Sequence, residues 1–196
     1  ALPSEDLEES LRTALATAAP GDEIELPKGR FEFSRMLTVT TSKVSIRGAG
    51  PENTQLDFSQ QAQGAQSVLV LGDNVEVSGF AVLNSPSDGI VARDVSNFRV
   101  THISVVWESG PSPSNGAYGI YPVLSRNVYV ADCYAKGASE AGIYVGQSIG
   151  GIVERNVVEG NVVGLDIENS QRIDVRKNSV QGNSLGILVA TRPGLI

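Results

Sequence analysis

Four copies of one short segment decide the fold: GIYPVLS at residues 119–125, GIYVGQS at 142–148, GLDIENS at 164–170 and GILVATR at 186–192. Their leading glycines are 23, 22 and 22 residues apart, and GIVARDV at 89–95 opens an earlier copy. Apolar and polar residues alternate in most copies, which is typical of short β-strands. A repeat of roughly 22 residues with its apolar positions in register and no helical segment predicts the stacked coils of a parallel β-helix.

The register extends beyond the glycines. The same offset within successive copies holds Val100, Val130, Val153 and Val175, which we expect to stack inward. A second inward offset holds Ile103, Cys133, Asn156 and Asn178. The two asparagines predict a hydrogen-bonded ladder, and Cys133, the single cysteine, is predicted to be a small buried core residue.

The N-terminal segment differs from the repeats. Residues 4–18 carry Leu7, Leu11 and Leu15 at helical spacing, with Ser4 as the expected N-cap. We predict that this helix covers the exposed edges of the first coil. We predict that the whole sequence, residues 1–196, forms one domain. Residues 22–196 form about seven rungs of it, and residues 107–118 form a loop inserted into these rungs.

The charge limits the possible partners. A net charge of −7 without a basic cluster disfavours nucleic acid. All apolar runs are short, so we expect no membrane insertion.

Two parts of the sequence resemble a known superfamily. The run PGDEIELPKG at 20–29 and the repeats at 164–170 and 176–180 resemble right-handed parallel β-helix proteins of the pectate-lyase-like superfamily, with repeats of the carbohydrate-binding and sugar-hydrolase type. The resemblance implies a right-handed helix, an acidic polysaccharide as ligand, and a secreted or periplasmic location. It also implies that the polymer is cleaved by a lyase or hydrolase or altered by an epimerase, although the repeats themselves encode coils and not chemistry.

Motifs for these activities are incomplete. The Asp-Pro-His-Asp motif in which alginate epimerases and related lyases resemble one another is absent, and the single histidine, His102, lies at a predicted solvated corner. Asp88 and Asp94 flank a predicted strand that contains Arg93, so they should not converge on calcium. We therefore predict no cofactor and no metal site, with calcium as the alternative.

Asp166 and Glu168 share the outward side of one predicted strand. Hydrolases of this fold need carboxylates that converge across rungs, and the neighbouring rungs offer none at these offsets. The pair is therefore either a solvated acidic pair or a set of substrate ligands.

The inserted loop is the strongest functional candidate, because insertions in a solenoid form loops on its binding face. Trp107 and Tyr118 border it, and Tyr121 and Tyr144 follow at one outward offset of adjacent rungs. Their rings suit the C–H faces of sugars, so we predict substrate binding by Trp107, Tyr118, Tyr121, Tyr144, Asp166 and Glu168. Proton transfer is assigned to Tyr144 or Tyr121 with Arg93 nearby. The alternative places Trp107 under the loop and stacks Tyr121 and Tyr144 on the outside of the rod.

Two functions remain open. One is a polysaccharide-recognising protein with possible lyase or epimerase activity. The other is a non-catalytic scaffold that binds a protein partner through a flat side. The last predicted coil, which ends at Arg192–Ile196, has no helix after it, so we also expect an oligomer or further chain to cover its edge.

Overall fold

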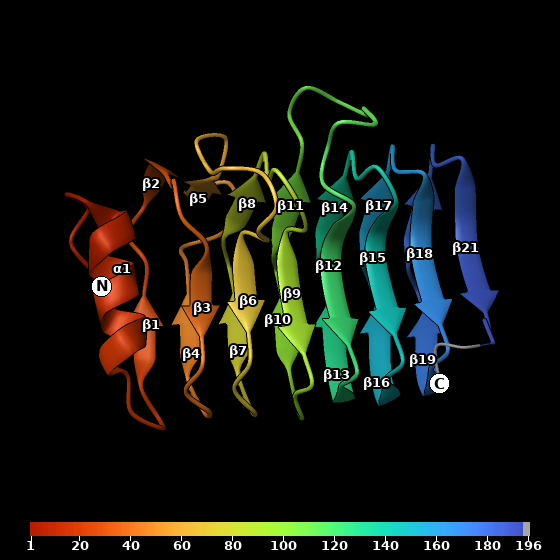
Figure 1. Ribbon diagram of the computed structural model, residues 1–196, viewed down its shortest axis with the longest axis horizontal. Coiled ribbons are helices and arrows are strands. Elements are labelled where there is room, and N and C mark those ends of the chain that lie inside the picture. Colours follow the sequence, from red (N-terminus) through yellow and green to blue (C-terminus); the bar gives the residue numbers. More distant parts are fainter. Residues whose placement is uncertain (194–196) are drawn as a thin grey trace.

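The computed structural model describes residues 1–193, which form a rod of stacked coils with α1 at one end (Figure 1). Within these residues, three parallel sheets of seven strands each run along the rod, and each coil visits the three sheets in turn. The predicted parallel β-helix of about seven rungs is therefore confirmed.

The sheets are numbered by the strand that opens each of them. The first sheet contains β1 (Glu23–Glu25), β4 (Ser45–Arg47), β7 (Glu76–Ser78), β10 (Arg99–Thr101), β13 (Arg126–Ala131), β16 (Ile149–Glu154) and β19 (Gln171–Arg176). The second contains β2 (Gly29–Glu32), β5 (Thr54–Asp57), β8 (Ala81–Leu83), β11 (Ser104–Val106), β14 (Tyr134–Lys136), β17 (Val157–Glu159) and β20 (Ser179–Gln181). The third contains β3 (Leu37–Val39), β6 (Val68–Val70), β9 (Ile90–Arg93), β12 (Tyr118–Val123), β15 (Ala141–Gly146), β18 (Val163–Glu168) and β21 (Leu185–Ala190).

The register follows the sequence repeat. Val130 pairs with Val153 and Val153 with Val175, as predicted. Val130 and Val153 are fully buried. These valines form one inward column of the core, and their alignment follows from the repeat length.

Polar ladders lock the corners between the sheets. The Nδ2 of Asn156 donates to the carbonyl of Val130, and its Oδ1 accepts from the amide of Cys133. Asn178 continues this ladder, as predicted, and Asn161 with Asn183 forms a second one that the sequence analysis missed. Buried amides that bond both backbone and the copy above satisfy groups which would otherwise be costly.

One corner uses the left-handed conformation without glycine. His102, Asp132, Arg155 and Lys177 hold the same offset in four coils, with φ between 52° and 56°. His102 is exposed there, so the prediction of a solvated corner is confirmed.

Helix α1 (Leu7–Thr17) buries Leu7, Leu11 and Leu15 and packs beside β2 and β3, which confirms its role as a cap. The predicted N-cap was wrong. Asp6, not Ser4, lies at the N-cap, and its side chain accepts from the amide of Glu9. Ser4 lies in the turn that precedes it.

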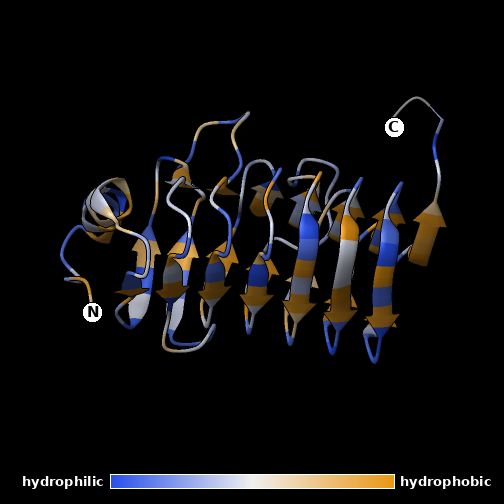
Figure 2. Cartoon of the chain, turned by 90° about the horizontal axis from the view of Figure 1, so that it is seen from below, coloured by the Kyte–Doolittle hydropathy of each residue, from blue (hydrophilic) through white to orange (hydrophobic). Residues whose placement is uncertain are grey.

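The opposite end of the rod carries no comparable cover in the described residues. Hydrophobic residues, orange in Figure 2, occur in the strands along the whole rod, including the last strand, β21. Ile187 and Val189, whose equivalents in β18 are buried, are 50% and 74% exposed. Residues 194–196 of the expected terminal stretch lie outside the described residues, and the expected oligomer stays a prediction.

Candidate functional site

Three tyrosines gather on the outer face of the third sheet. The ring centroids of Tyr118 and Tyr121 are 4.7 Å apart, those of Tyr118 and Tyr144 are 4.7 Å apart, and those of Tyr121 and Tyr144 are 4.9 Å apart. The three rings therefore form one triangular cluster across β12 and β15. We call Tyr118, Tyr121, Tyr144, Asp166 and Glu168 the tyrosine site.

The repeat register builds this cluster. Ile120 pairs with Ile143, and both point into the core, so the following tyrosines point outward. Tyr144 pairs with Asp166 on β18, which adds a carboxylate to the same outer column. Gly146 lies beside the ring of Tyr144, and a Cβ atom at this position would collide with that ring. The missing side chain makes room for the ring to lie along the sheet.

Asp166 and Glu168 are buried, so the alternative of a solvated acidic pair was wrong. Asp166 is 7% exposed and Glu168 is 5% exposed. The hydroxyl of Tyr144 donates to Oε2 of Glu168 at 2.6 Å, and the guanidinium of Arg192 forms an ion pair with Oε1. Oδ1 of Asp166 is buried and has no hydrogen-bond partner among the described residues. Neighbouring side chains therefore cover most of both carboxylates.

Burial sets the proton equilibria of the site. It raises the pKa of Asp166 to about 6, and the charge of Glu168 adds to the rise. It also raises the pKa of Tyr118 to about 12. Burial and the hydrogen bond to Glu168 raise the pKa of Tyr144 further still. At neutral pH the tyrosines are proton donors, whereas Asp166 is close to its titration point.

Arg93 lies one rung below the tyrosines, but not directly beneath them. It pairs with Val123, while Val91 pairs with Tyr121. Arg93 is exposed. Burial raises the pKa of Tyr121, and the charge of Arg93 opposes this rise by a smaller amount, which shows that the two side chains are close.

Two acidic residues belong beside the site, although the sequence analysis did not assign them to it. Asp88 accepts a hydrogen bond from the amide of Tyr118, and burial raises the pKa of its carboxyl. The charge of Glu140 raises the pKa of both Tyr118 and Asp166. The repeat holds a signal for Asp88, since it precedes Gly89 as Tyr118 precedes the next leading glycine.

Trp107 does not bind substrate through an exposed ring, so that assignment was wrong. The side chain is 3% exposed, and its Nε1 donates to the carbonyl of Ser85. Glu108 follows it and bonds Arg30 and Asn84, so the start of the loop is fixed to the second sheet. Tyr121 and Tyr144 lie together on the outside of the rod, as the alternative interpretation described, but their rings meet edge to face and do not stack.

The inserted loop covers a groove of about 340 Å³. Pro111 and Pro113 form one wall, and Ala138 and Val162 form part of the other. Ser139 also lines it and directly precedes Glu140, which places the groove beside the tyrosine site. The loop therefore extends the site with apolar surface.

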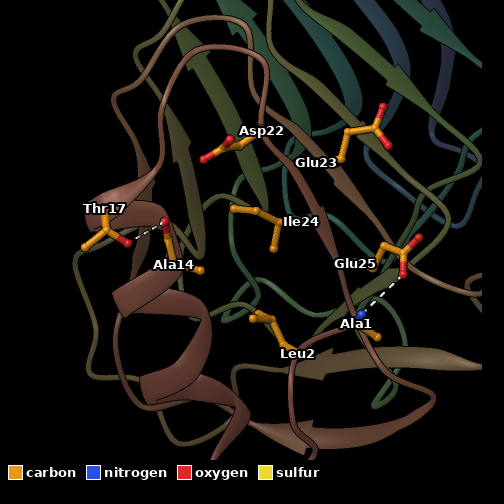
Figure 3. Close-up of a pocket in the computed structure, with 8 residues that line it drawn as sticks. All are labelled: Ala1, Leu2, Ala14, Thr17, Asp22, Glu23, Ile24 and Glu25. Atoms are coloured by element: carbon orange, nitrogen blue, oxygen red, sulfur yellow. Dashed lines mark hydrogen bonds and ion pairs between the residues drawn. The ribbon is translucent and has the colours of Figure 1, made fainter.

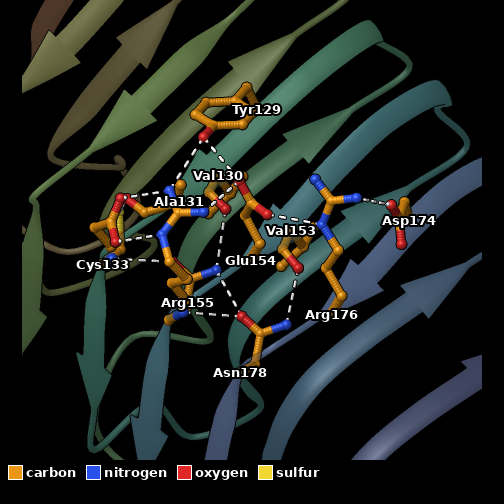
Figure 4. A network of polar contacts seen from close by, with 12 residues as sticks. Tyr129, Val130, Ala131, Cys133, Val153, Glu154, Arg155, Asp174, Arg176 and Asn178 are labelled. Carbon is orange, nitrogen blue, oxygen red and sulfur yellow. Dashed lines mark hydrogen bonds and ion pairs between the residues drawn. The ribbon is translucent and has the colours of Figure 1, made fainter.

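Other polar and hollow regions lie elsewhere on the rod. A cavity of about 500 Å³ lies between α1 and β1, where the N-terminal amine of Ala1 pairs with Glu25 (Figure 3). On the outer face of the first sheet, Glu154 joins Tyr129, Arg155 and Arg176 (Figure 4). These partners, Arg176 first, lower the pKa of Glu154 to about 2. The network is satisfied within the chain, so we assign it to stability.

The described part of the chain contains neither a group of side chains placed to hold a metal ion nor a helix suited to span a membrane. No three His, Cys, Asp or Glu side chains among residues 1–193 are grouped to hold a metal ion. None of the helices there has the length and apolar character needed to cross a membrane. Calcium therefore stays an untested alternative.

Comparison with known proteins supports the fold. The sequence matches the family model of the right-handed β-helix region over residues 38–195. No curated protein sequence matches it significantly. Among solved structures, the A-module of the Azotobacter vinelandii mannuronan C-5 epimerase AlgE4 superposes with a TM-score of 0.70 at 18% identity, covering 91% of this chain and 54% of that one. The A-module of AlgE6 from the same organism gives 0.63 at 18% identity, with 94% and 57% covered.

A third solved structure widens this set. A pectin methylesterase in complex with a hexasaccharide gives a TM-score of 0.53 at 12% identity, covering 88% of this chain and 64% of that one. The chain thus spans just over half the length of the epimerase modules and about two thirds of the esterase. These structural neighbours are carbohydrate-acting β-helix enzymes.

Proposed function

Because the chain belongs to the right-handed β-helix family, we propose that the outer face of its third sheet binds a polysaccharide at the tyrosine site. The observation that carries this proposal is the triangle of tyrosine rings beside two buried carboxylates. Aromatic faces pack against the C–H faces of sugars, while carboxylates and hydroxyls bond their polar edges. A secreted or periplasmic location is part of the same proposal.

The direction of the sheet suits a polymer. Adjacent strands lie about 4.8 Å apart, so a chain lying along the rod meets a new side chain at each coil. From β9 to β18 it passes Arg93, which lies to one side, and then Tyr121, Tyr144 and Asp166. Arg93 and Tyr121 offer most of the accessible surface, because Tyr144 is 6% exposed and Asp166 is 7% exposed. The loop groove beside Glu140 adds apolar surface at the side. The mannuronan epimerase modules and the hexasaccharide-bound esterase support a sugar polymer as the ligand.

We further propose proton-transfer chemistry of the lyase or epimerase type. Such reactions remove the ring proton next to a sugar carboxylate, which requires a base, an acid and a group that holds the carboxylate. Asp88 fits the base, because it is partly exposed, burial raises its pKa, and its charge and that of Arg93 both act on Tyr121. Tyr121 or Tyr144 fits the acid, since both are protonated at neutral pH. Arg93 is suited to hold the sugar carboxylate, because it forms no ion pair within residues 1–193.

These roles revise the sequence-based assignment. Tyr144 donates to Glu168, and its raised pKa opposes use as a base. In an epimerase, the proton leaves to a base on one face of the ring and a proton returns from an acid on the other. In a lyase, the same abstraction expels the glycosidic oxygen, which the acid protonates.

A scaffold function is the second candidate. In this function a flat side of the rod binds a protein partner. Val162, which lines the loop groove and is 46% exposed, is an apolar side chain suited to such a contact.

Tyr121→Ala tests the proposal, because the ring is partly exposed and takes part in the cluster. Affinity for polysaccharide oligomers, measured by calorimetry, should fall by about tenfold or more, as expected for the loss of one stacked ring. The matched control is Tyr134→Ala, an outward and partly exposed tyrosine on β14 of the second sheet, which should leave affinity unchanged. Equal affinities for both variants and the parent would refute the site. Binding of a protein partner without binding of any glycan would favour the scaffold.

A further inference from the structure

The β18 end of the tyrosine site carries excess negative charge. Burial is the larger cause of the raised pKa of the Asp166 carboxyl, and the charges of Glu168 and Glu140 both act on Asp166 and raise this pKa further. The one ion pair that these three carboxylates form in the described part of the chain joins Glu168 to Arg192. Arg93 stands at the other end, on β9, and acts on Asp88 and Tyr121. Glu140 and Asp166 therefore form no ion pair within residues 1–193.

Asp166 also lacks a donor. Its side chain is only 7% exposed, and its buried Oδ1 has no hydrogen-bond partner among residues 1–193. A buried carboxylate oxygen without a donor is costly, and a bound group that donates to it recovers that cost. A sugar carboxylate at this point would instead add a third negative charge beside Asp166 and Glu168, which opposes binding.

The surroundings suit a positive group. An ammonium has three donors and no acceptor, and the neighbouring rings of Tyr118 and Tyr144 offer electron-rich faces to a cation. The chain already places one cation here, the guanidinium of Arg192, whose side chain is 63% exposed and pairs with Glu168. Its charge lowers the pKa of Asp166, which shows that a cation at this position acts on that carboxylate.

We propose that the sugar unit held at β18 carries a free amine, so that the site takes an amino-sugar glycan in preference to a polyuronate. This inference rests on the proposed polysaccharide function. The ammonium donates to Asp166 and lies among the tyrosine rings, while the rest of the polymer follows the outer face toward β9. Proton-transfer chemistry on a uronate would then be confined to the unit beside Arg93.

A matched pair of ligands tests the proposal. Glucosamine oligomers and their fully N-acetylated counterparts share a backbone and differ in the charge of the amine. Calorimetry at pH 6 with the parent protein should show the amine form binding at least about tenfold more tightly, the scale of one charge-assisted contact. Galacturonate oligomers of equal length should bind more weakly than either form.

Two variants locate the effect. Asp166→Asn should abolish the preference for the amine form, so that this variant binds the amine and acetylated oligomers with affinities within about twofold of each other. Asp174→Asn, which removes an exposed carboxylate on the first sheet, should keep the preference. Arg192→Gln should strengthen amine binding, because the competing guanidinium is gone.

The outcomes separate the two proposals. Acetylated or acidic oligomers that bind as tightly as the amine form would overturn the amine inference and leave polysaccharide binding in place. A preference that survives in Asp166→Asn would overturn it too. Failure of amine, acetylated and acidic oligomers alike to bind the parent would overturn both the inference and the proposed function.

Discussion

Replacing Asp166 by asparagine should stabilise the protein at neutral pH. The carboxyl has a pKa of about 6 in the folded chain and an ordinary value of 3.8. A difference of about two pKa units corresponds to roughly 3 kcal/mol of unfavourable interaction with the charged form. Partial solvation reduces this, so we expect a gain of about 1 to 2 kcal/mol.

The sign of this effect fixes its pH dependence. Because the folded pKa of this acid lies above its unfolded value, the folded state binds protons more readily than the unfolded state between about pH 3.8 and pH 6. The parent therefore loses stability from Asp166 as the pH rises through that window, and the loss is complete above it. The advantage of Asp166→Asn should be full at pH 7.5 and nearly absent at pH 3.5.

Urea unfolding at the two pH values measures the difference. Asp174→Asn is the control, because it also removes one aspartate charge but from an exposed position. It should change stability by no more than about 0.5 kcal/mol at either pH. A variant at position 166 that is less stable than the parent at pH 7.5, or equally shifted at both pH values, would refute the account of the buried carboxylate.

Three further predictions concern the coils. Val153→Asp places an unpaired charge in a fully buried column and should cost more than about 3 kcal/mol in urea unfolding, so a melting temperature within two degrees of the parent would contradict the register. Asn156→Ala leaves the amide of Cys133 without its acceptor and should cost about 2 to 4 kcal/mol, whereas a neutral result would deny the ladder its role. Burial raises the pKa of the Cys133 thiol to about 12, so thiol reagents at pH 8 should modify it only on unfolding, and rapid labelling of the native protein would disprove this.

Sequence alone determined the coil and its register. Val130, Val153 and Val175 pair as their common offset predicts, and so do Asn156 and Asn178. The physical reason is that a parallel ladder repeats the same contacts in each coil. A fixed spacing along the chain therefore becomes a fixed position in space. Tyr121, Tyr144 and Asp166 follow from the same rule, since an outward offset in one copy is outward in the next.

Tertiary structure alone decided what covers each outward side chain. The register places Asp166 and Glu168 on the outside, yet a tyrosine hydroxyl from the coil below and a guanidinium from beyond β21 contact Glu168. Trp107 looked available because it borders an insertion, but the path of the loop turns its ring inward to Ser85. A repeat fixes the backbone position of a residue, whereas exposure, pairing and pKa depend on side chains from other coils and on an insertion that breaks the repeat.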